Sequence, residues 1–316
     1  MRILFFGTPE FAVPPLEALH IAGHRIVLVV TRPDARSGRG LKTLPSPVKS
    51  AALRLGLPIH QPRSVNKTQA LERFRTENAE LGVVVAFGQI LGRELLRIPQ
   101  RGFLNLHASL LPRYRGAAPI NWAITKGEKE TGVSVVRMSA ELDAGPILAQ
   151  QAVPIGEDST AGELHDVLCR VGTSLLADVI NRLNRGEEIQ DWQQDESVVS
   201  YAPKLTKKDR RVDWNRTAAE ICNMIRGLSP WPGACSRFIG RDREEEVILV
   251  RTARSPEQSA PAPPGAVVEV SDVEGILVNA GEGAVRILEL KPASGRAMTA
   301  ADFAHGRRVR PGDCFA

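Results

Sequence analysis

The chain has 316 residues, of which 43% are hydrophobic and 24% are charged. This length and composition exclude a disordered chain, a collagen-like fibre and a disulfide-stapled mini-protein, and they predict two globular domains or one large one. The net charge of +5 permits an acidic partner without requiring one. The apolar runs are too short to span a bilayer, so we expect no membrane partner.

Strand-like and helix-like segments alternate over the first part of the chain. Short apolar runs predict buried strands at 2–6, 25–30, 81–86, 102–107 and 133–138. Apolar residues at helical spacing predict helices at 11–22, 47–55 and 160–183. Such alternation is typical of βαβ units, so we expect an α/β domain with a parallel sheet, whose ligands bind beyond the C-terminal ends of the strands.

The pattern changes after residue 186, where the sequence becomes polar and loses its periodicity. We therefore predict a first domain at 1–189, a linker at 190–206 and a second domain at 207–316. Short β-rich stretches separated by Gly and Pro predict a small β-barrel or sandwich in the second domain, at 234–239, 246–251, 266–270, 275–278 and 285–290.

The four cysteines lie far apart and make no CxxC or Cys/His ligand spacing: Cys169, Cys222, Cys235 and Cys314. We interpret them as reduced thiols of a cytoplasmic protein, and we expect no metal site. The chain also lacks the Walker A and GxGxxG motifs, so the sequence gives no support for ATP or NAD.

The clearest chemical signal lies at the end of the strand predicted at 102–107. Asn105 and His107 are two residues apart, so strand geometry places both side chains on one face. Acyl transfer uses such a pair, because an amide donates to a developing oxyanion and an imidazole donates to it or moves a proton. Asp143, in a turn-rich loop after the next strand, is a candidate to orient His107. The alternatives are a structural histidine and a turn-forming aspartate.

The residues around this pair resemble the signature of the 10-formyltetrahydrofolate-dependent formyltransferases: Asn105-x-His107-x-Ser109-Leu110-Leu111-Pro112-x-Tyr114-Arg115-Gly116, followed by Asp143-x-Gly145. The resemblance implies a Rossmann-like first domain in which Asn105, His107 and Asp143 are catalytic. It also implies 10-formyltetrahydrofolate as the co-substrate, no metal, and a folate site formed by four consecutive residues: Ser109, Leu110, Leu111 and Pro112.

The acceptor is indicated by further similarity to the branch of this family that formylates methionyl initiator tRNA. Residues 7–11, 117–122 and 131–133 resemble that branch. The sharper signal is the segment 31–49, which resembles a basic loop that enters the acceptor stem. It holds a single acid, Asp34, and five cations: Arg32, Arg36, Arg39, Lys42 and Lys49. Such cations can pair with RNA phosphates, although a solvated surface loop is the alternative.

The resemblance thus implies that Arg39, Lys42 and Arg36 contact tRNA, and that 207–316 is an OB-like barrel that also contacts it. We expect a cytoplasmic monomer that formylates the α-amine of methionyl initiator tRNA for translation initiation. The alternatives are a formyltransferase acting on a 4-amino sugar nucleotide, a formylfolate hydrolase, and a non-catalytic RNA-binding protein with a degenerate folate pocket.

Overall fold

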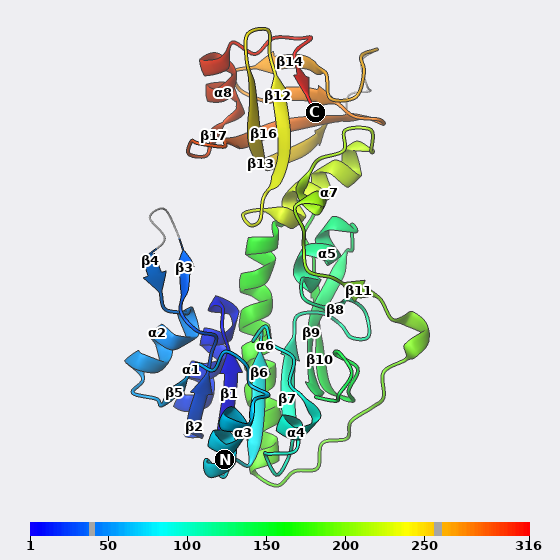
Figure 1. Cartoon of the computed structure of the whole chain (residues 1–316). Helices are drawn as coiled ribbons and strands as arrows, with labels where there is room; N and C mark the ends of the chain where they lie inside the picture. Colours follow the sequence, from blue (N-terminus) through cyan, green and yellow to red (C-terminus); the bar gives the residue numbers. More distant parts are fainter. Residues whose placement is uncertain (38–41, 256–260) are drawn as a thin grey trace. The chain divides into compact units, whose positions relative to one another are not determined.

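The computed structural model describes residues 1–37, 42–255 and 261–316 (Figure 1). The chain divides into two compact units. The first consists of residues 1–119, 131–153 and 165–203, and the second of residues 120–130, 154–164 and 204–316. The two units therefore interleave along the chain, and residues 190–203 belong to the first. The proposed boundaries at 189 and 206 stay a prediction.

The first unit is built on a seven-stranded sheet with the strand order β10-β9-β7-β6-β1-β2-β5. The strands are β1 (Arg2–Gly7), β2 (Arg25–Val30), β5 (Ile59–His60), β6 (Leu81–Val85), β7 (Phe103–His107), β9 (Glu130–Arg137) and β10 (Ile147–Pro154). The pairs β1–β2, β1–β6, β2–β5 and β6–β7 are parallel, whereas β9 runs antiparallel to β7. The predicted α/β fold with a mostly parallel sheet is confirmed.

Helices connect these strands: α1 (Val13–Ile21), preceded by the short η1 (Glu10–Ala12), then α2 (Pro47–Arg54), α3 (Thr68–Thr76), α4 (Arg93–Leu96), α5 (Pro119–Thr125) and α6 (Ala161–Asn184). Helix α2 begins where the sequence predicts it, because the Ser46 hydroxyl accepts a hydrogen bond from the Lys49 amide at 3.1 Å and Pro47 occupies the first turn. Strands β5 and β10 were not predicted, since β5 is two residues long and β10 is partly exposed.

An aromatic cluster anchors the sheet in the core of the first unit. The Phe6 ring on β1 makes edge-to-face contacts with Phe74, Phe87 and Phe103, with ring centroids 5.5, 5.3 and 5.4 Å apart. Such contacts add about 0.5–1.5 kcal/mol per pair to the burial of the rings. The packing fixes β1, β6 and β7 relative to one another, and β7 carries the predicted catalytic pair.

Two small strand pairs lie outside the main sheet of the first unit. Strands β3 (Ala35–Ser37) and β4 (Lys42–Leu44) form an antiparallel pair within the basic segment. Strands β8 (Arg115–Gly116) and β11 (Tyr201–Ala202) pair in parallel, across more than eighty residues of sequence. The short η2 (Glu196–Val198) precedes β11, and η3 (Lys208–Arg210) follows it.

The second unit is an antiparallel barrel with the strand order β14-β15-β16-β13-β12-β18, and β17 pairs with β16. Its elements are α7 (Ala218–Leu228), β12 (Ala234–Ile239), β13 (Glu244–Ser255), β14 (Val267–Ser271), β15 (Gly275–Asn279), β16 (Ala284–Pro292), β17 (Met298–Thr299), α8 (Ala300–Arg307) and β18 (Cys314–Phe315). A bridge between Ala266 and Cys314 joins the two end strands, with the Val267 amide donating to the Asp313 carbonyl at 2.8 Å. The predicted OB-like barrel is confirmed.

The barrel has its own hydrophobic core, in which the rings of Phe303 and Phe315 lie 5.3 Å from that of Phe238. All four cysteines of the chain are free thiols. Within the described ranges, no helix is both long enough and apolar enough to cross a membrane.

Candidate active site

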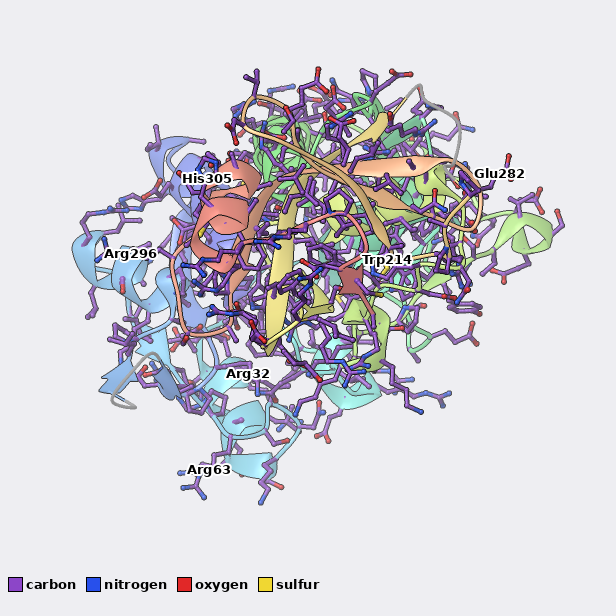
Figure 2. All side chains as sticks on the ribbon, turned by 90° about the horizontal axis from the view of Figure 1, so that it is seen from above. Arg32, Arg63, Trp214, Glu282, Arg296 and His305 are labelled. Carbon is purple, nitrogen blue, oxygen red and sulfur yellow. The ribbon has the colours of Figure 1, made fainter. Side chains whose placement is uncertain are left out.

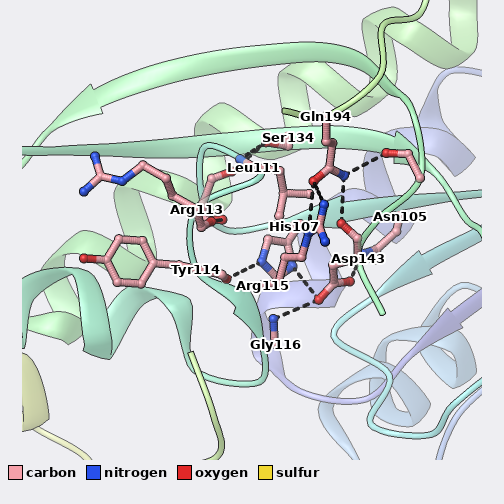
Figure 3. A network of polar contacts seen from close by, with 12 residues as sticks. Asn105, His107, Leu111, Arg113, Tyr114, Arg115, Gly116, Ser134, Asp143 and Gln194 are labelled. Atoms are coloured by element: carbon pink, nitrogen blue, oxygen red, sulfur yellow. Dashed lines mark hydrogen bonds and ion pairs between the residues drawn. The ribbon is translucent and has the colours of Figure 1, made fainter. Parts of the chain in front are cut away.

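Asn105 and His107 project from β7 into one buried polar cluster (Figure 3). Their side chains share a face because they are two residues apart on a strand. The Asn105 side-chain amide donates to Asp143 Oδ1 at 3.3 Å, and His107 Nδ1 lies 3.7 Å from Asp143 Oδ2. The structure thus brings together the three residues that the sequence singled out as catalytic candidates.

The neighbours of His107 show which of its two ring nitrogens carries a proton. Nε2 lies 2.9 Å from the backbone carbonyl of Tyr114. A carbonyl only accepts, so Nε2 must carry a proton. Nδ1 faces the Asp143 carboxylate at 3.7 Å, beyond direct hydrogen-bond distance. A protonated Nδ1 would be attracted to the carboxylate, whereas a neutral ring leaves the lone pair of Nδ1 facing it. Nδ1 is therefore the nitrogen at which a proton can enter or leave.

Asp143 reaches this cluster through an unusual loop path. Strand β9 runs antiparallel to β7, so it ends beside the start of β7, where the Met138 amide donates to the Phe103 carbonyl at 2.8 Å. The loop after β9 must fold back to place Asp143 beside Asn105 and His107. Parallel βαβ reasoning alone does not predict this path, because it assumes that successive strands end at the same edge.

Two backbone features hold the fold-back in place. Asp143 has φ +49°, in the left-handed region that aspartate tolerates better than most residues. A Cβ at position 145 would lie 1.8 Å from the Arg137 carbonyl oxygen, so only glycine fits there. These two demands explain the Asp-x-Gly spacing. Asp143 Oδ2 also accepts from the Gly116 amide at 2.9 Å, which ties the carboxylate to the loop after β7.

The predicted folate loop, Ser109 to Pro112, is organised by Ser134 on β9 (Figure 3). The Ser134 hydroxyl donates to the Ser109 carbonyl at 2.6 Å and accepts from the Leu111 amide at 3.1 Å. The Gln150 side-chain amide donates to the same hydroxyl and to the Leu111 carbonyl, at 2.8 Å each. Leu111 is buried, whereas Leu110 and Pro112 are partly exposed. The loop is thus a fixed apolar surface beside His107.

Sequence reasoning missed two residues that support this cluster, Gln194 and Ser134. It quoted Arg115 within the motif but gave it no role. Gln194 contacts the Asp143 loop and the buried Arg115 guanidinium (Figure 3). No local pattern reveals Gln194, because its partners lie 51 and 79 residues away in sequence.

Two of the candidate tRNA contacts lie in the short strands of the basic segment. Arg36 lies in β3 and Lys42 in β4, whereas Arg39 lies outside the described residues. Asp34 pairs with Lys49 at 2.6 Å and accepts from Gln61 at 2.7 Å. The side chain of Arg32 is exposed, as is that of Arg63 in a neighbouring loop (Figure 2). Within the described ranges, no group of three or more His, Cys, Asp or Glu side chains could hold a metal ion.

Comparisons with known proteins show the family to which the chain belongs. Residues 1–180 match the family described as "Formyl transferase", and residues 204–308 match "Formyl transferase, C-terminal domain". The chain therefore belongs to the formyltransferase family, and the resemblance drawn from residues 105–116 and Asp143 is confirmed.

Individual relatives show how similar this chain is to particular formyltransferases. The chain is 44% identical to the methionyl-tRNA formyltransferase of Heliobacterium modesticaldum, over 100% of both chains. It is 45% identical to that of Citrifermentans bemidjiense, over 99% of this chain and 95% of the relative. The sugar 3N-formyl transferase WlaRD, solved in the presence of dTDP and 5-N-formyl-THF, matches with a TM-score of 0.66 at 19% identity, covering 94% of this chain and 99% of WlaRD. At that identity the likeness concerns the fold alone.

Proposed function

We propose that this protein transfers a formyl group from 10-formyltetrahydrofolate to the α-amine of methionyl initiator tRNA, as a step in translation initiation. The observation that carries the proposal is the similarity to methionyl-tRNA formyltransferases at 44 and 45% identity across essentially the whole chain. The buried cluster of Asn105, His107 and Asp143 supplies the groups that such an acyl transfer needs.

The described residues fit the folate co-substrate. A formyl oxygen that becomes negative needs a donor, and Asn105 has two side-chain N–H groups, of which one is bonded to Asp143. Leu110 and Pro112, which follow His107 closely in the chain, offer partly exposed apolar surface. We assign Ser109, Leu110, Leu111 and Pro112 to the folate site on that basis. When bound, 10-formyltetrahydrofolate supplies the activated formyl group.

The chemistry follows from the groups around His107. A free α-amine has a pKa of about 7.7–8.0, so a substantial fraction is already nucleophilic near neutral pH. As the amine attacks, the second Asn105 N–H would donate to the oxygen that gains negative charge. His107 would accept the proton of the amine at Nδ1, directly or through water, and return it to the folate nitrogen as the formyl C–N bond breaks and tetrahydrofolate leaves. The carboxylate of Asp143 would stabilise the charged ring. The geometry requires no covalent intermediate with the protein.

We assign tRNA binding to the basic segment 31–49, with Arg36, Arg39 and Lys42 as the contacts. The support is charge and position in the sequence. Asp34 is the single acid of the segment, and it already pairs with Lys49 and accepts a hydrogen bond from Gln61. The remaining cations therefore have no acid within their own segment, which suits them to phosphates.

The decisive experiment offers the protein two acceptors in parallel, with labelled 10-formyltetrahydrofolate. One is charged methionyl initiator tRNA and the other is a 4-amino sugar nucleotide, and a third reaction has no acceptor. We expect transfer to the tRNA alone, with binding that weakens as salt is added. Transfer to the sugar would leave the catalytic cluster intact and overturn the acceptor. Formate release without an acceptor would indicate a formylfolate hydrolase.

We further propose that the protein acts as a monomer in the cytoplasm. The free thiols of its four cysteines fit a reducing compartment. Light scattering during size-exclusion chromatography should give one 34.4 kDa chain per particle. A mass of two chains or more would overturn the monomer.

A further inference from the structure

A segment outside the signature motif lines the catalytic cluster from 191 to 202, here called the 191–202 segment. At its start, the backbones of Trp192 and Ile147 exchange hydrogen bonds of 2.9 and 3.0 Å. At its end, the Arg115 amide donates to the Ser200 carbonyl at 2.9 Å, and the Ala117 amide donates to the Ala202 carbonyl at 2.8 Å. The backbone of the segment thus contacts the start of β10 and the loop that follows β7.

Gln194 is the side chain that joins this segment to the loop of Asp143 (Figure 3). Among the described residues, no other side chain of the segment donates a hydrogen bond to that loop. Its Nε2 donates to the Asp143 and Gly145 carbonyls, at 2.8 Å each. Both N–H groups of the amide are therefore used on one short turn. The side chain is buried, with 8% of its surface exposed, so these bonds have little competition from water.

The other end of the same amide faces Arg115. Gln194 Oε1 accepts from Arg115 Nη2 at 2.8 Å and from Nε at 3.1 Å. The guanidinium is 4% exposed and also pairs with Glu196 at 2.7 Å. Arg115 follows Tyr114, whose carbonyl accepts from His107. Gln194 consequently links the backbone that carries Asp143 to the backbone that orients His107.

We propose that Gln194 is a positioning residue for formyl transfer, acting through Asp143. Without its two N–H donors, the Asp143 and Gly145 carbonyls would lie buried or half-buried with no partner from this side chain, and the left-handed backbone of Asp143 would lose its main restraint. Asp143 would then move from His107 Nδ1. A shift of about 1 Å at such a group costs up to about 100-fold in rate.

Two substitutions separate the two ends of the amide. Gln194→Met keeps the length of the side chain and removes every hydrogen bond. Gln194→Glu keeps an acceptor for Arg115 but, when ionised, has no donor for the two carbonyls. We expect both to lower kcat about 10–100-fold, with KM for folate and for tRNA changed less than about 3-fold. Gln193→Ala, the exposed neighbour, is the matched control and should keep the activity of the unaltered protein.

The pH dependence gives a readout that a purely structural role would not move. Protonation of the carboxyl introduced by Gln194→Glu supplies one O–H donor, which can bond to the carbonyl of Asp143 or of Gly145. The activity of this variant relative to the unaltered protein should therefore rise as the pH falls, whereas the relative activity of Gln194→Met should stay flat. Full activity of the Glu variant at neutral pH would mean that only the Arg115 end matters, and it would overturn the proposal.

A double substitution tests whether Gln194 acts through Asp143. In an Asp143→Asn background, Gln194→Met should lower kcat little further, because the group it positions is already altered. Independent, multiplying losses would overturn the proposal, as would a Gln194→Met protein with unchanged kcat. The inference rests on the proposed function, but the two fail differently. If the unaltered protein formylates neither acceptor, the function is wrong, whereas active Gln194 variants count against the positioning role alone.

Discussion

The cluster around Asp143 and the basic segment 31–49 are both polar, but they are built in opposite ways. Around Asp143 a buried network of hydrogen bonds joins the carboxylate and its backbone to Asn105, Gly116 and Gln194. In the basic segment the single acid, Asp34, already accepts hydrogen bonds from Gln61 and Lys49. These bonds hold the pKa of Asp34 below its usual range. In our proposal, the first region fixes the atoms for chemistry and the second supplies charge for binding tRNA.

The largest effect should come from removing the donors of the buried cluster. We expect Asn105→Ala and His107→Ala each to lower kcat by about 10²–10³-fold, the usual loss for one oxyanion donor. The dissociation constant for tRNA should hardly change, because we assign tRNA binding to the basic segment. Rapid-quench kinetics and filter binding measure the two quantities. A variant that keeps near-full turnover would break the assignment of its residue.

A smaller effect should follow from loosening the folate loop. Ser134→Ala leaves the Ser109 carbonyl and the Leu111 amide without their shared partner, and each unsatisfied buried group costs about 1–3 kcal/mol. We expect a lower free energy of unfolding in urea and a higher KM for folate, with tRNA affinity unchanged. The exposed Ser50→Ala is the control. If folate KM stays constant, the Ser109–Pro112 loop does not hold the folate.

The basic segment should show the reverse profile. Arg39→Ala should weaken tRNA binding. The slope of a plot of log affinity against log salt concentration should also become less steep by about 1, the value expected for the loss of one phosphate contact. The rate of the chemical step at saturating tRNA should be preserved. Arg73→Ala removes a cation that already pairs with Glu77 and should leave both quantities unchanged. A loss of kcat alone would place Arg39 with the catalytic cluster instead.

The smallest effect concerns a second buried imidazole, which has no carboxylate partner among the described residues. Burial lowers the pKa of His24, and the neighbouring N-terminal ammonium lowers it further, although a hydrogen bond to Asn181 opposes both. The unfolded chain then binds more protons than the folded one below a pH of about 6.5, so stability falls as the pH drops through that value. The slope cannot exceed about 1.4 kcal/mol per pH unit for this group.

Urea unfolding at pH 8 and pH 5 would measure this effect. The unaltered protein should lose more stability between the two conditions than a His24→Asn variant does. An equal loss in both proteins would show that His24 does not contribute to the pH dependence. Catalysis should be unaffected at pH 8, which separates this histidine from His107.

The sequence predicts those features that depend on local spacing. Alternation along β7 suffices to place Asn105 and His107 on one face, and apolar runs locate five strands of the first sheet. The turn-rich loop makes Asp143 a candidate and the family resemblance implies that it is catalytic, but neither predicts the fold-back after β9 that brings it to the cluster. The sequence fails to predict the role of Gln194 for a related reason. It lies in a polar stretch without periodicity, and its importance comes from partners distant in the chain.

The 191–202 segment has a consequence for dividing or recombining proteins of this kind. A chimera that joins the first 189 residues to another C-terminal half would carry Asn105, His107 and Asp143, yet it would inherit a foreign residue opposite the Asp143 turn. Gln194 and its partner Arg115 would come from different parents. The part to exchange as one unit is therefore longer than the stretch that bears the signature. A junction beyond residue 203 keeps the loops that carry His107 and Asp143 with the segment that contacts them.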